Sequence, residues 1–293
     1  MYSLILSEEK KKTLDAIAGA LKQIAPVKAI VLGGSHCTHL ATESSDLDIG
    51  IYYSQKAAFD IEEIRALASK FSVDGNPTVT SLYGWGPWVN GGAWMETAGG
   101  KVDLLYRNIE QVVSTIEKAK SGEWMNDFDQ QPPYGYSSIF YLGETEHCIP
   151  LYDPEGIVGY LKSQVRPYPH LLKESVTQQC LWAAEFSLWH ADYFLKKGDI
   201  YNLMGCLART IKYLTTVLFS INEIYPMGDK NALEILGRAQ KCPPDLKEKA
   251  ESIFCADRKE LAKSVKDLRS LFEETAAQAG GCYKPAFKLK RKS

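Results

Sequence analysis

The segment Asp46–Ile51 alternates polar and apolar side chains, and its first two polar positions are Asp46 and Asp48. A period of two is typical of a β-strand, because successive side chains of a strand point to opposite faces. The apolar members would face a core, and the two acids would share the other face. Two acids so close repel each other, and in a partly buried site they need a cation or a proton to coexist. The pattern indicates a sheet with a charged face; an acid pair that caps a turn or sheet edge explains it equally well.

The rest of the first half alternates helix and strand signals, which is the pattern of an α/β domain. A Gly-rich turn at 98–100 separates two extended runs and predicts a β-hairpin within 85–106. The other elements that we expect are helices at 7–24, 61–71 and 109–120, strands at 27–32, 47–53 and 78–83, and a short helix beginning at Ser35.

From about residue 155 onward almost every segment has helical periodicity. Apolar residues at steps of three and four predict long helices on both sides of Gly198-Asp199, which would end one helix and cap the next. Further helices are expected at 231–239, 245–254 and 258–278. The sequence therefore predicts an α+β chain: a small mixed sheet with helices in a domain 1–150, then a helical bundle in a domain 151–293.

Composition narrows the class of protein. The chain has 293 residues and a net charge of −2, so it lacks a surface-wide basic field for nucleic acid. The basic tail 284–293 could contact RNA or phosphates, although a solvated terminus explains it more simply.

The longest uncharged stretch, 75–95, is broken by Gly, Pro and Asn and predicts no membrane span. The start of the chain has no secretory signal pattern. Seven scattered Cys without a CxxC pair predict reduced thiols in the cytoplasm.

Two further features accompany the acid pair. Gly33-Gly34-Ser35 ends the predicted strand 27–32, where glycines let a phosphate approach the backbone N–H groups and Ser35 adds a hydroxyl. An ordinary turn also explains these three residues. Asp103 is the single acid of an apolar run, and burial of an unpaired carboxylate is costly. A metal site or a solvated edge strand would each account for Asp103.

Gly34-Ser35, the nearby Asp46 and Asp48, and the lone Asp103 on a later strand together resemble the DNA polymerase β-type nucleotidyltransferase superfamily. This resemblance implies a catalytic domain in which the Gly33, Gly34 and Ser35 turn holds the triphosphate. It also implies that Asp46, Asp48 and Asp103 hold two Mg²⁺ ions and carry the catalysis. The acceptor hydroxyl would attack the α-phosphate of a nucleoside triphosphate and release pyrophosphate.

The helical second half resembles the bacterial aminoglycoside and other small-molecule nucleotidyltransferases, in which a helical domain closes the active-site cleft. On this resemblance Lys230, in the run 218–230, would contact the ATP phosphates, although an exposed loop lysine explains it as well. Glu185 and Asp192 are candidates for binding the substrate, although they share a helix side with other polar residues, as a solvated face would.

The resemblance thus predicts transfer of a nucleoside monophosphate, with AMP from ATP favoured, to a small-molecule hydroxyl such as that of an antibiotic. Alternatives are a tRNA or protein acceptor, a metal-dependent glycosyltransferase that uses sugar nucleotides, and a nucleotide-binding module without catalysis. Trp85, Trp88 and Trp94 would line a cleft for a base or sugar, or simply pack in the core. The sequence identifies neither the acceptor nor the oligomeric state.

Overall fold

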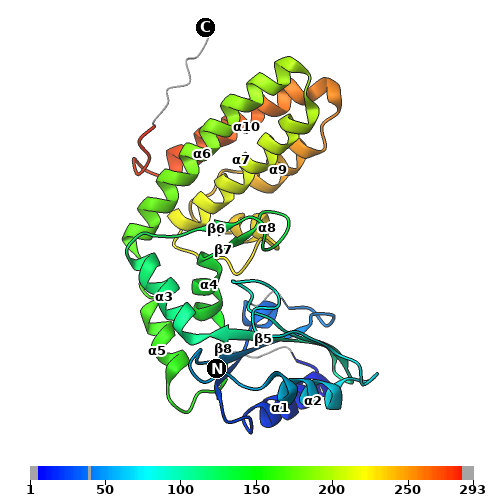
Figure 1. Cartoon of the computed structure of the whole chain (residues 1–293). Helices are drawn as coiled ribbons and strands as arrows, with labels where there is room; N and C mark the ends of the chain where they lie inside the picture. The colour runs from blue at the N-terminus through cyan, green and yellow to red at the C-terminus, as the bar shows by residue number, and fades with distance from the viewer. Residues whose placement is uncertain (1–5, 39–40, 286–293) are drawn as a thin grey trace. The chain divides into compact units, whose positions relative to one another are not determined.

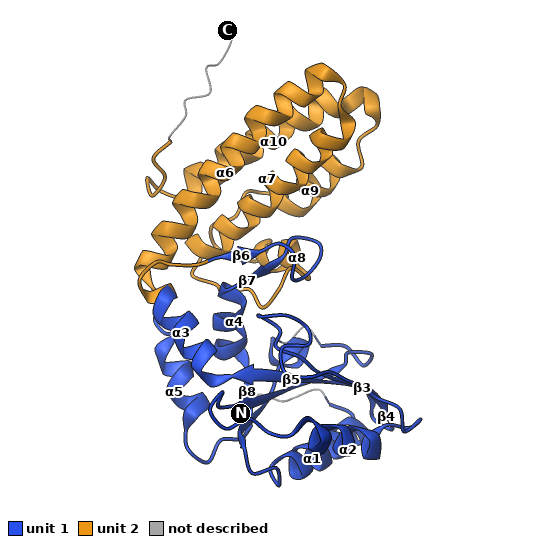
Figure 2. Cartoon of the chain, in the orientation of Figure 1, with its two compact units in different colours: residues 1–118, 125–167 blue, residues 119–124, 168–293 orange. Residues whose placement is uncertain are grey.

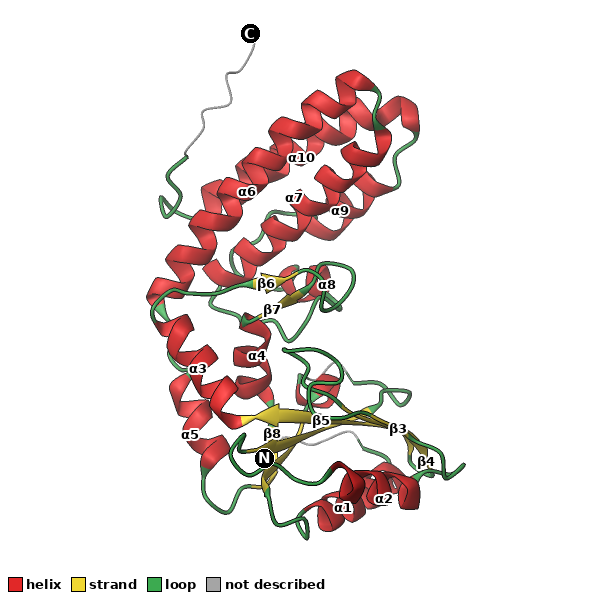
Figure 3. Ribbon diagram, in the orientation of Figure 1, coloured by secondary structure: helices red, strands yellow, loops and turns green. Residues whose placement is uncertain are grey.

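The computed structural model describes residues 6–38 and 41–285 (Figure 1). The chain divides into two compact units, residues 1–118 with 125–167 and residues 119–124 with 168–293 (Figure 2). The first unit contains a mixed sheet with helices, and the second is helical (Figure 3). The predicted fold class is therefore confirmed. The functional division after residue 150 stays a prediction, and the tail residues 286–293 lie outside the described part of the chain.

The sheet of the first unit places one parallel pair at its centre. In the described residues the strand order is β3-β4-β5-β2-β1-β8; β2 and β5 pair in parallel and the other neighbours are antiparallel. The strands are β1 (Val27–Leu32), β2 (Leu47–Tyr53), β3 (Thr78–Val79), β4 (Gly92–Thr97), β5 (Gly100–Asn108) and β8 (Ile149–Tyr152). A separate pair consists of β6 (Asn126–Asp127) and β7 (Tyr136–Ser137).

The two faces of this sheet differ in their cover. Helices α1 (Glu8–Leu21) and α2 (Ile61–Phe71) pack on one face (Figure 1). The core there takes alternate residues of the strands, among them Ile49 of β2 and Leu104 of β5. The opposite face carries Asp48 and Asp103, as the alternation in the sequence predicts. The unit also contains α3 (Ile109–Lys120), α4 (Ile139–His147) and α5 (Ile157–Gln164).

Several boundaries differ from the sequence prediction. The strand expected at 78–83 is only Thr78–Val79, because the chain then turns repeatedly, with left-handed φ angles at Tyr83 and Asn90. The first helix ends at Leu21, three residues early. Strand β8 and helix α4 were not predicted. β8 is only four residues long and contains a proline, so its alternation is too short to recognise.

The second unit is built on a helical hairpin. Helices α6 (His170–Lys197) and α7 (Ile200–Ile221) are joined at Gly198, whose φ is +68°, and the Asp199 carboxylate caps α7 by accepting from the Asn202 N–H. The predicted stop and cap are thus confirmed. The remaining helices are α8 (Ala232–Leu236), α9 (Leu246–Phe254) and α10 (Leu261–Gln278), with the 3-10 turn η2 (Arg258–Glu260).

Two further findings concern the cysteines and the longest helices. All seven cysteines are free thiols. Over residues 6–38 and 41–285, no helix combines the length and the apolar character needed to cross a membrane.

Candidate active site

The turn after β1 is built against β2. A single 3-10 turn, η1 (Gly34–Cys37), follows the strand, and the Gly33 N–H donates to the Asp48 carbonyl at 2.8 Å. Gly34 has a φ of +60°, and a Cβ atom there would overlap the Asp48 carboxyl group, with Asp48 Cγ only 2.6 Å away. Position 34 therefore requires glycine for its backbone conformation and for the close approach of the Asp48 side chain.

Asp48 and Asp103 come from neighbouring strands at the same level. They are register partners in the parallel β2–β5 pair, and their flanking residues are buried in the core on the other face. Paired residues of adjacent strands lie about 4.8 Å apart and point to the same side. Two acids distant in the sequence are thus brought side by side on the open face of the sheet, next to the Gly33–Ser35 turn.

Asp46 lies one residue before β2 and is exposed. Its loop is held by the buried Lys10 of α1, whose Nζ donates to the carbonyls of Glu43 at 2.5 Å and Ser45 at 2.6 Å. His36 is buried beside this loop, and burial together with the charge of Lys10 lowers the pKa of its imidazole. Asp46 is therefore positioned by a fixed loop rather than by the strand itself.

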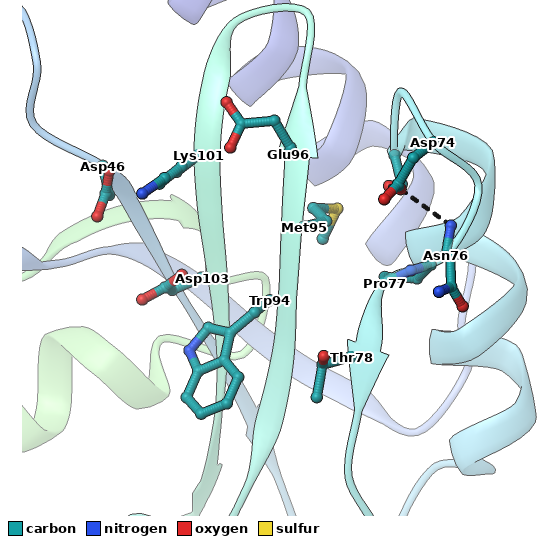
Figure 4. Close-up of a pocket in the computed structure, with 11 residues that line it drawn as sticks. Asp46, Asp74, Asn76, Pro77, Thr78, Trp94, Met95, Glu96, Lys101 and Asp103 are labelled. Atoms are coloured by element: carbon teal, nitrogen blue, oxygen red, sulfur yellow. Dashed lines mark hydrogen bonds between the residues drawn. The ribbon is translucent and has the colours of Figure 1, made fainter.

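A hollow of about 420 Å³ opens beside these acids, within the range of small-molecule sites (Figure 4). Asp46 and Asp103 line it together with residues of β3, β4 and the preceding loop. The charged lining residues are four carboxylates and one ammonium group: Asp46, Asp74, Glu96, Asp103 and Lys101. The hollow is consequently electronegative.

Asp74 on the rim of this hollow stays ionised at neutral pH. Its carboxylate accepts hydrogen bonds from the Ser72 hydroxyl at 2.5 Å and the Asn76 N–H at 3.0 Å. These hydrogen bonds lower the pKa of the carboxyl group.

The donor set fits a hard divalent cation in its chemistry. Carboxylate oxygens are the ligands that Mg²⁺ prefers, and Asp48 and Asp103 lie side by side at paired strand positions. Over the residues that the structure describes, no three acidic, histidine or cysteine side chains already stand close enough to hold a metal ion together. The backbone thus pairs Asp48 with Asp103, while the carboxylates of Asp46, Asp48 and Asp103 do not stand together as a ready metal site.

The other end of the same sheet face is closed. Arg107 of β5 is buried and donates from Nε and Nη2 to the two carboxylate oxygens of Glu144 in α4, at 2.7 and 2.9 Å. Tyr141 of α4 lies under the guanidinium, 5.6 Å from ring centroid to Cζ. Chemistry on this face is therefore confined to the end that carries Asp48 and Asp103.

Three residues predicted to bind substrates lie in the second unit. Lys230 is exposed in the loop before α8, where the neighbouring Asp229 pairs with Lys212. Glu185 is buried and accepts a hydrogen bond from the Tyr283 hydroxyl. Asp192 accepts from Arg269 at 2.7 Å; both acids thus have partners inside their own unit. The roles predicted for Lys230, Glu185 and Asp192 stay predictions.

Sequence reasoning missed Lys10. It lies on the buried stripe of α1 with Leu14, Ile17 and Leu21, and a lysine on an otherwise apolar stripe is the signal that could have revealed it.

Trp85 and Trp94, which were expected near a cleft or in the core, stack on each other with ring centroids 4.1 Å apart, and Trp94 lines the hollow. Trp88 instead packs against Tyr136 and Tyr141, so its contacts are those of a structural cluster.

Comparison with known proteins gives one family match. Residues 14–82 match the model of the nucleotidyltransferase domain, a segment that includes the glycine turn, Asp46 and Asp48 and ends before Asp103. No curated protein matches the chain. Among solved structures, a nucleotidyltransferase-like protein from Exiguobacterium sibiricum is similar, with 10% identity over 93% of this chain and 77% of that one and a TM-score of 0.46.

Proposed function

This chain contains a nucleotidyltransferase domain of the DNA polymerase β-type superfamily, and we propose that it moves a nucleoside monophosphate from a triphosphate to the hydroxyl of a small molecule. We further propose ATP as the donor and Asp46, Asp48 and Asp103 as the ligands of two Mg²⁺ ions. The observation that carries this proposal is the register pairing of Asp48 with Asp103 beside the Gly33–Ser35 turn.

In the proposed reaction the acceptor oxygen forms a bond to the α-phosphorus, and the bond from that phosphorus to the bridging oxygen breaks. The electron pair leaves with pyrophosphate. Bound Mg²⁺ would lower the pKa of the acceptor hydroxyl and offset the negative charge of the pyrophosphate. The Gly34 N–H and the Ser35 hydroxyl bind the β- and γ-phosphates, while the Gly33 N–H, which donates to the Asp48 carbonyl, fixes the turn. Asp103 accepts the hydroxyl proton and passes it to solvent.

The charge of the hollow supports a small acceptor over a nucleic acid. Beyond the carboxylates assigned to metal, Asp74 and Glu96 stand against one ammonium group, Lys101, and this balance disfavours a long phosphate backbone. The volume of the hollow suits a molecule of drug size. Transfer to tRNA or protein is the competing outcome, which labelled macromolecule bands would reveal. Lys230 as a phosphate contact, and Glu185 and Asp192 as substrate contacts, are separate proposals that single alanine variants would test.

The decisive variant is Asp48→Asn, assayed by Mg²⁺-dependent transfer of label from α-labelled ATP and by pyrophosphate release. We expect a loss of about 10²–10³-fold, the usual effect of removing one group that stabilises transition-state charge. Circular dichroism and urea unfolding should show that the variant stays folded. Asp15→Asn, an exposed acid of α1, is the matched control and should keep full activity. Wild-type labelling by Asp48→Asn would remove the assignment.

A further inference from the structure

One row of side chains crosses the open face of the sheet at a single level. Asp48 pairs in register with Asp103, Asp103 with Trp94, and Trp94 with Thr78. Register partners point to the same side of a sheet, so these four side chains, from β2, β5, β4 and β3, share one face. Trp94 is therefore the neighbour of Asp103 on the side away from Asp48 and the Gly33–Ser35 turn.

Trp94 has the exposure and support of a stacking platform. Nearly half of its surface, 47%, is exposed, although its strand neighbours Ala93 and Met95 are buried in the core. Trp85 lies behind it in a stacked arrangement, with ring planes 23° apart. A ring held from one side by another ring has lost its rotamer freedom already, so it binds a ligand at low entropic cost. Figure 4 shows the Trp94 ring beside Asp103 in the hollow.

The direction of the proposed reaction assigns this platform to the acceptor. In an in-line displacement the nucleophile enters opposite the leaving group. If the Gly33–Ser35 turn next to β1 binds the leaving pyrophosphate, the acceptor enters from the other side of the carboxylates, over β5 and β4. That is the side on which Trp94 and the hollow lie.

We propose that Trp94, backed by Trp85, is the platform on which a ring of the acceptor stacks, and that the ring-bearing acceptor is cationic or neutral but not anionic. The charge preference follows from the wall of the hollow, where Asp74 and Glu96 stand beyond the carboxylates assigned to metal and only Lys101 opposes them. A tryptophan face attracts cations as well. The inference rests on the proposed function and names the class of its acceptor.

The test measures binding of three ring alcohols of one size by saturation-transfer NMR on the full chain: an aminocyclohexanol, a cyclohexanediol and a hydroxycyclohexanecarboxylate. An open-chain aminohexanol separates stacking from charge. We expect the amine to bind best, the carboxylate about tenfold or more weaker, and the open chain weaker than the ring. Trp94→Ala should weaken the ring amine by about three- to tenfold, the size of a tryptophan–cation contact. Trp94→Phe should restore most of it.

Trp189→Ala is the matched control, since Trp189 is a similarly exposed tryptophan on α6, and it should leave binding unchanged. Glu96→Gln should reduce the preference for the amine. Absence of saturable binding by every ring probe, equal binding by Trp94→Ala, or equal binding of the carboxylate would each overturn the inference. A raised KM for ATP in Trp94→Ala, with ring-probe binding unchanged, would reassign the platform to the nucleotide base. Failure of the proposed function is seen separately, as unaltered labelling by Asp48→Asn.

Discussion

Gly34→Ala would test whether the glycine turn positions the Asp48 carboxylate. Gly34 has a left-handed φ of +60°, a conformation that costs a residue with a Cβ atom about 1–2 kcal/mol. The new methyl group would also overlap the Asp48 carboxyl group, whose Cγ lies 2.6 Å from that position. Because this carboxyl group is the end of a short side chain, it can rotate away, at a further cost of about 1 kcal/mol. We therefore expect a loss of about 2–3 kcal/mol in unfolding free energy.

The matched control is Gly156→Ala. Gly156 has a φ of +69°, and a Cβ atom there would meet nothing within 4 Å. Gly156→Ala should lose only the conformational part, about 1–2 kcal/mol of unfolding free energy, and should keep its activity. Urea unfolding followed by fluorescence gives both stabilities.

Transfer of label from α-labelled ATP separates the two variants. Gly34→Ala displaces the Asp48 carboxylate and should lose activity about as severely as Asp48→Asn, about 10²-fold or more. Wild-type kcat and KM in a folded Gly34→Ala protein would refute the link between the turn and Asp48. Equal activity losses in the two glycine variants would indicate a general effect of backbone strain.

Two other predictions concern buried groups. Lys10→Met removes both hydrogen bonds to the 43–45 loop and should cost about 2 kcal/mol of unfolding free energy in urea. It should also lower the rate of pyrophosphate release. The control Lys11→Met, at an exposed position, should change neither quantity. Burial raises the pKa of the Cys37 and Cys180 thiols from 9.0 to about 12, so these thiols stay protonated in the folded chain while they ionise in the unfolded one. The free energy of unfolding should therefore be retained below pH 9 and fall between pH 9 and 12. The urea midpoint of Cys180→Ala should fall less steeply over this range than that of the wild type. An equal fall with pH in the two proteins would contradict the assignment.

The strands at the centre of the sheet were predictable because their signal is local. The strand Leu47–Tyr53 contains most of the alternating run 46–51 and extends it by two tyrosines. Val27–Leu32 is bounded by Pro26 and a glycine pair. The alternation also predicted which side of β2 and β5 faces the core.

The partners of these strands could not be predicted, since pairing depends on residues far apart in the chain. Nothing near Asp103 specifies that it aligns with Asp48, or that Trp94 aligns with Asp103. The short strand β8 was missed because four residues give too little periodicity, and its place beside β1 is a tertiary effect. The sequence therefore indicated that Asp46, Asp48 and Asp103 are candidate site residues, but only the structure showed where each of them lies in the sheet.

The parallel alignment of β2 with β5 has a consequence for folding. A slip of one residue between these strands would invert every side chain of one of them and drive an ionised aspartate into the aliphatic interior. Desolvation of that charge would cost several kcal/mol, so misaligned pairings are disfavoured before helices α1 and α2 can seal them in. The aspartates that we assign to catalysis therefore also favour the native register of β2 and β5 during folding. Neutral replacements should make a shifted register less unfavourable.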